Sequence, residues 1–85
     1  MRKVRVRRTK PRIEGRFTVV IEACEEGGYF AECPVLAGCH VEAETYESVL
    51  TEMRAAIRAY LADLVAAGEP IPKAEITVTS LNVAV

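Results

Sequence analysis

The chain has 85 residues, of which 51% are hydrophobic and 27% are charged. This length supports one small hydrophobic core, which excludes two independent domains, and the apolar content excludes disorder along the whole chain. No run approaches the roughly 18–20 apolar residues of a membrane-spanning helix, and the basic start does not lead into the apolar stretch of a signal peptide. We therefore expect a cytoplasmic, single-domain protein.

The formal net charge of −1 conceals a basic N-terminal arm and an acidic body. Residues 1–16 have a charge balance of +7, whereas residues 17–85, the single predicted domain, have a balance of −8. Basic runs are typical of arms that contact nucleic acid. A solvated arm, an extra edge strand, or an arm that pairs with an acidic neighbouring subunit are the alternatives. The candidate nucleic-acid-binding residues are Arg2, Lys3, Arg5, Arg7, Arg8, Lys10 and Arg12.

Three segments of the body are predicted to form an antiparallel meander. Residues 17–24 are rich in β-branched and aromatic side chains, as strands are. The pair Gly27–Gly28 permits the positive φ angles of a hairpin turn. Residues 29–33 then form the return strand, and residues 39–43 form the third strand.

A long helix is predicted after the meander. Thr45 has the character of an N-cap, Gly68 is a natural helix end, and Pro70 prevents continuation. Between them, apolar residues recur every three to four positions, as on a helix with one buried face. These residues are Val49, Leu50, Met53, Ile57, Leu61 and Leu64.

Residues 75–85 alternate between apolar and polar side chains at their start, which predicts a fourth strand. The expected fold is therefore α+β, in the order β-β-β-α-β, with one helix on one face of the sheet. Such a sheet leaves one face and an edge unprotected, so we expect a homodimer or a dimer of dimers.

No residue pattern predicts catalysis or a cofactor. The three cysteines are odd in number and are predicted to be buried free thiols. The spacing of Cys33, Cys39 and His40 is not a zinc pattern. Adjacent strand residues point to opposite faces, so Cys39 and His40 cannot pair as nucleophile and base. We expect His40 to be a surface or packing residue and the protein not to be an enzyme.

Three glutamates on neighbouring predicted strands leave a metal-dependent nuclease as an alternative. If Glu22, Glu32 and Glu42 clustered on one face, they could hold a divalent cation. A solvated acidic sheet face is the simpler interpretation. Binding of Mg²⁺ or Mn²⁺ would distinguish the two.

The order of five short motifs resembles the HicB-like antitoxin family. The motifs are the strand 17–22, the Gly27–Tyr29 turn, the Cys33–Cys39 connection, the Thr45 cap and the Gly68–Pro72 helix exit. Each motif is common by itself, but the ordered set is specific and extends over most of the chain. The chain departs from the family pattern inside the connection and in the third strand, at Val35, Ala37 and Ala43.

The resemblance implies a truncated RNase H-like fold and a non-catalytic protein that binds and neutralises a small, basic HicA-type toxin that cleaves mRNA. Residues 17–85 contain no counterpart of the C-terminal DNA-binding module of many members. The acidic body suits such a basic partner. The candidate toxin-facing residues, chosen by charge, are Glu25, Glu26, Glu32 and Glu42. The alternative function is a stand-alone nucleic-acid-binding or regulatory module that uses the basic arm.

Overall fold

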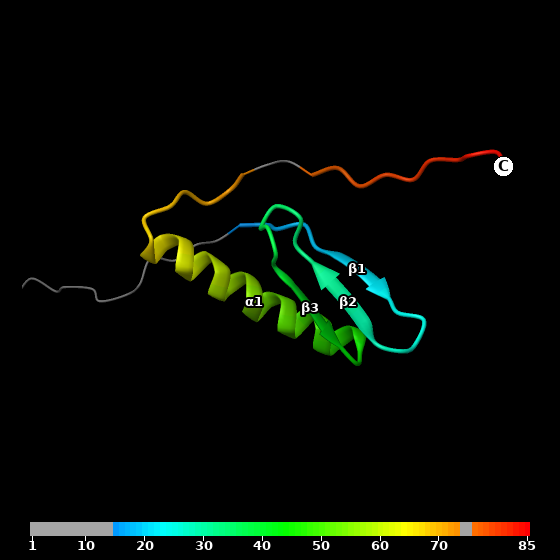
Figure 1. Ribbon diagram of the computed structural model, residues 1–85, viewed down its shortest axis with the longest axis horizontal. Helices are drawn as coiled ribbons and strands as arrows, with labels where there is room; N and C mark the ends of the chain where they lie inside the picture. The colour runs from blue at the N-terminus through cyan, green and yellow to red at the C-terminus, as the bar shows by residue number, and fades with distance from the viewer. Residues whose placement is uncertain (1–14, 74–75) are drawn as a thin grey trace, which may run out of the picture.

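The computed structural model describes residues 15–73 and 76–85, and they form a three-stranded sheet followed by one long helix (Figure 1). The strands are β1 (Val20–Ala23), β2 (Tyr29–Glu32) and β3 (His40–Ala43), and the helix is α1 (Tyr46–Ala66). The predicted α+β class and the order β-β-β-α are confirmed. Residues 1–14, which hold every candidate nucleic-acid-binding residue, lie outside the described part of the chain.

The strands pair consecutively and antiparallel, in the sheet order β1-β2-β3. The pairing is shorter than predicted, because β1 begins at Val20 and not at residue 17. Gly28 in the β1–β2 turn has a φ of 83°, and a Cβ built there would lie 3.0 Å from the carbonyl oxygen of Ala43. The hairpin therefore needs glycine at this position.

A closed loop joins β2 to β3. The amide of Cys33 donates to the carbonyl of Cys39 at 3.0 Å, which closes the loop at its base. Within the loop, the amide of Leu36 donates to the carbonyl of Cys33 at 3.0 Å, and the amide of Cys39 donates to the carbonyl of Leu36 at 3.0 Å. These hydrogen bonds turn the Leu36 side chain into the core, where it is only 1% exposed.

Helix α1 begins at a capping box. The Thr45 hydroxyl accepts a hydrogen bond from the Ser48 amide at 3.0 Å, and the Thr45 amide donates to the Ser48 hydroxyl at 3.1 Å. The pair satisfies two backbone donors, the Ser48 amide of the first turn and the N-cap amide itself. Glu47 in the first turn adds a negative charge at the positive end of the helix dipole.

The helix ends in a Schellman motif at the predicted glycine. Gly68 adopts a φ of 72°, and its amide donates to the carbonyl of Val65 at 3.1 Å. The next amide, of Glu69, donates to the carbonyl of Leu64 at 2.9 Å. Ile71 then packs against the core. No helix in the described ranges is long and apolar enough to cross a membrane.

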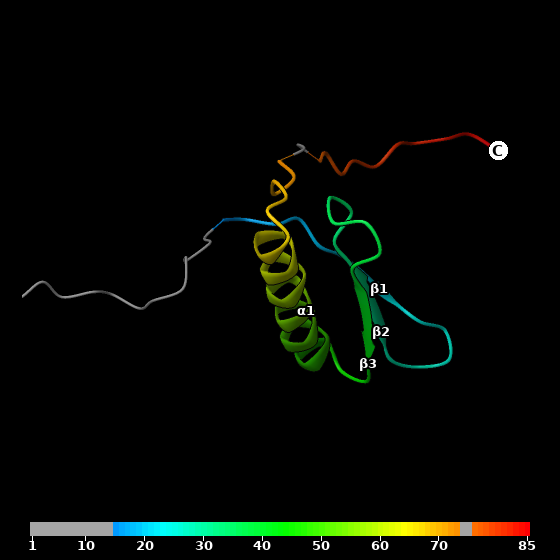
Figure 2. The same ribbon diagram turned by 60° about the vertical axis from the view of Figure 1, so that its left-hand side comes forward.

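The core lies between one face of the sheet and α1. The helix lies over β2 and β3, whereas β1 adds Ile21 to the packing at the side of the core. Figure 2 shows the helix as a separate layer beside the sheet. The predicted apolar face of the helix is confirmed, since all of its residues are buried or half-buried. The fully buried set is Ala31, Cys33, Leu36, Cys39, Val49, Met53 and Leu61.

The prediction of a fourth strand is wrong for the described residues 76–85. They are extended but form no strand, and Val78 and Leu81 are 71% and 80% exposed. A strand needs a neighbour to accept and donate its backbone hydrogen bonds. The apolar alternation correctly indicated extended backbone, but no strand of the described body pairs with this segment.

Candidate protein-binding face of the sheet

The face of the sheet opposite α1 is exposed and acidic. In the register, Phe30 pairs with Glu22 on one side and with Glu42 on the other, and Glu32 pairs with Val20 and His40. The intervening row contains Ala31, which is fully buried, so that row faces the helix. We call the opposite side the outer face, and its residues are Val20, Glu22, Phe30, Glu32, His40 and Glu42.

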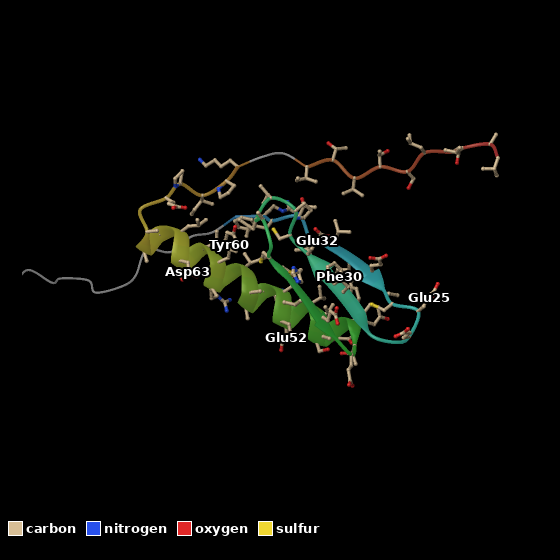
Figure 3. The ribbon with its side chains drawn as sticks, in the orientation of Figure 1. Glu25, Phe30, Glu32, Glu52, Tyr60 and Asp63 are labelled. Carbon is tan, nitrogen blue, oxygen red and sulfur yellow. The ribbon has the colours of Figure 1, made fainter. Side chains whose placement is uncertain are left out.

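An aromatic pair lies on the outer face among the carboxylates. The rings of Phe30 and His40 have centroids 5.5 Å apart and are tilted by 31°. Cys39, the residue before His40, is buried on the other side. The predicted role of His40 as a surface and packing residue is therefore confirmed. Figure 3 shows Phe30 and Glu32 on the same strand of the sheet.

The four candidate toxin-facing glutamates fall into two places. Glu32 lies on the outer face, near the end of the sheet that holds the Cys33–Cys39 loop. Glu25 lies in the β1–β2 turn at the other end, as Figure 3 shows. Glu26 and Glu42 come together, because they line one hollow of about 550 Å³ beside this turn.

The hollow adds a residue that charge alone did not single out. Glu44 lines it together with Glu26, Glu42 and Tyr29. Glu44 follows β3 directly, in the bend that leads into α1. The positive φ of Gly28 brings the β1–β2 turn against this end of β3. Three acidic residues thereby line one concave surface.

The metal-site alternative is not supported. Glu22, Glu32 and Glu42 do share the outer face, as the alternation suggested. However, Phe30 lies between Glu22 and Glu42 in one cross-strand row, and Glu32 lies in the next row. Within residues 15–73 and 76–85, no group of three or more His, Cys, Asp or Glu residues could hold a metal ion.

The cysteines are free, and two of the three are buried as predicted. Cys33 and Cys39 flank the closed loop inside the core. Burial raises the pKa of the Cys39 thiol above its ordinary value, and the neighbouring Cys33 raises it further. Both effects disfavour the reactive thiolate. Cys24 is exposed, contrary to the prediction, because β1 ends one residue before it and its side chain is outside the layer under α1.

Sequence comparison finds small relatives that align over most of their own length. A UPF0150 protein of Synechocystis sp. is 38% identical over 69 residues, which are 81% of this chain and 87% of that protein. A UPF0150 protein of Thermoplasma acidophilum is 38% identical over 58 residues, or 68% of this chain and 84% of that protein. A UPF0150 protein of Archaeoglobus fulgidus is 37% identical over 46 residues, which are 54% of this chain and 67% of that protein. No family model matches the sequence. On the strength of these relatives, the chain belongs to the UPF0150 family.

Proposed function

We propose that this protein is an antitoxin-like binding protein that neutralises a small, basic, mRNA-cleaving toxin of the HicA type. The observation that carries the proposal is the exposed acidic surface formed by the outer face and the adjoining hollow. The ordered motifs that resemble the HicB-like family indicate the class of partner. The protein needs no catalytic group of its own for this function.

The charge of the surface suits an RNA-cleaving partner. Such a toxin binds the phosphates of its substrate with basic side chains. The carboxylates around the hollow would attract the same basic side chains, steer the association and exclude RNA from them. The acidic body, with its balance of −8, would itself repel RNA. Phe30 and His40 supply the less polar centre that protein interfaces use for affinity.

The proposal predicts that this protein inhibits a HicA-type toxin. Cleavage of a synthetic mRNA should fall in proportion to added protein and stop at one equivalent per toxin. Because charge steers the association, the affinity should fall as salt rises from about 50 to 300 mM. Ribonuclease A, a basic nuclease of a different fold, is the control and should stay active. Undiminished mRNA cleavage at saturating protein would refute the proposal.

The charge asymmetry of the sequence favours a second candidate function, contact with nucleic acid through residues 1–16. Full-length protein should then bind DNA or RNA with an affinity that falls steeply with salt, because each phosphate contact releases counterions. Deleting residues 2–12, which removes seven basic side chains, should abolish that binding and leave toxin inhibition intact. A filter-binding titration measures the first and the mRNA assay measures the second. Binding that survives the deletion would overturn this candidate.

A further inference from the structure

The C-terminal segment 76–85 is extended but pairs with no strand in the described part of the chain. It contains no charged residue, it is extended, and all its residues are exposed. Figures 1 and 2 both show it apart from the sheet and the helix, ending beyond the β1–β2 turn. Uncharged segments rich in β-branched residues pair with any open strand edge, and folded proteins keep them covered. This segment therefore needs a partner.

The apolar positions of the segment change face in its middle. Ile76 and Val78 lie on one face of the extended chain, whereas Leu81, Val83 and Val85 lie on the other. The residues between them, 79 and 80, mark the change. One four-residue edge such as β1 cannot cover ten residues with two apolar faces. The two halves of the segment thus require two different surfaces.

The domain has an open edge with an apolar groove beside it. β1 is an outer strand of the sheet, and α1 does not cover it. Between α1 and the residues that lead into β1 lies a groove of about 520 Å³, with Arg54 and Arg58 among its lining residues. Its apolar lining consists of Phe17, Val19, Leu50, Met53, Ile57 and Leu61.

We propose that residues 81–85 of one copy pair with the β1 edge of a second copy, in a reciprocal exchange. Leu81, Val83 and Val85 would point into the partner's groove, since all three share one face. Residues 76–79 would bridge the two copies near the two-fold axis, where Ile76 and Val78 would pack against their symmetry equivalents. The face change in the segment is thereby explained by its two environments.

The size of this interface fits a weak, concentration-dependent dimer. Residues 81–85 span about 17 Å in an extended strand, so two exchanged segments and the surfaces beneath them bury roughly 700 Å². Contacts between residues 76–79 of the two copies add roughly 300 Å², which brings the total to about 1,000 Å², the lower limit for specific interfaces. A second copy is favoured over the segment's own β1 edge because the segment lies apart from that edge in both views.

The test uses the full chain at about 200 μM. Light scattering should give twice the monomer mass of 9.3 kDa. In a sample that mixes isotope-labelled with unlabelled protein, filtered NMR experiments should detect contacts from Leu81 and Val83 methyls to Phe17 and Val19 between copies. Leu81→Glu should weaken dimerisation at least about tenfold, because a charge replaces a buried apolar side chain.

Asn82→Glu is the matched control, since it adds the same charge one position along, on the face that points away from the groove. It should leave the dimer intact. Both variants should keep the helical circular dichroism of the wild type, because neither residue contributes to the core. A monomer, contacts to β1 within one copy only, or a dimer that is insensitive to Leu81→Glu would each overturn the proposal.

Discussion

Reversing two charges around the hollow, as Glu26→Lys with Glu42→Lys, should weaken binding of the basic toxin by about 100-fold or more. Both residues line the same concave surface. Each reversal replaces attraction to a basic partner by repulsion, and close charge pairs across interfaces couple by about 1.5–7 kcal/mol. Titration calorimetry at about 100 mM salt measures the loss.

The control for this variant is Glu52→Lys with Asp63→Lys, which changes the net charge by the same amount. Both residues are exposed on α1, away from the outer face (Figure 3). Their reversal should change the affinity by less than about fivefold, since exposed charges beyond a Debye length are largely screened. If the helix variant binds as poorly as the hollow variant, binding depends on net charge alone and the hollow is not the site.

Glu32→Lys locates the surface more finely. Glu32 lies on the outer face at the opposite end of β2 from the turn that carries Glu26. A contact that extends over the whole outer face predicts a loss close to that of the double variant. A contact centred on the hollow predicts a much smaller loss. Comparing the two losses of affinity therefore shows whether the partner covers the whole outer face or only the end of the sheet beside the hollow.

The acidic character of this surface was predictable from the sequence, but the grouping of its glutamates around the hollow was not. Alternation along a strand places Glu22, Glu32 and Glu42 on one face once the pairing is known. The backbone of the β1–β2 turn determines that Glu26 lines the same hollow as Glu42 and that Glu25 does not. The same turn sequence can adopt several backbone geometries, so only the structure shows which glutamates of the turn line the hollow.

Local and non-local features of the fold were predictable to different degrees. The start of α1 at Thr45 and its end before Gly68 depend on side chains within one turn of each end, and both predictions are correct. A strand depends on a partner that may be distant in sequence. The first strand is shorter than its β-rich segment because the β2 pairing ends at Glu32, opposite Val20. Residues 76–85 are not a strand because no described strand of the chain pairs with them.

Leu36→Ala should lower the free energy of unfolding by about 3 kcal/mol. Leu36 is 1% exposed in the core, and truncating a buried leucine removes its burial energy and leaves a cavity. The closed Cys33–Cys39 loop holds its backbone by three hydrogen bonds and cannot collapse into the space. For a chain of 85 residues, total stability is on the order of 4–13 kcal/mol, so the loss is a large fraction. Urea denaturation followed by helical circular dichroism measures it.

Leu36→Met is the matched control, because it nearly conserves volume and should cost less than about 1.5 kcal/mol. An equal, small effect of both substitutions would show that the loop does not anchor the core.

The Leu36→Ala variant also separates stability from recognition. Leu36 lies under the sheet and is not part of the outer face. Its folded fraction should bind the toxin with wild-type affinity, whereas the Glu26→Lys and Glu42→Lys variant should be fully folded and bind poorly. A loss of affinity in folded Leu36→Ala, together with unchanged binding by the double variant, would contradict the placement of the binding surface at the hollow.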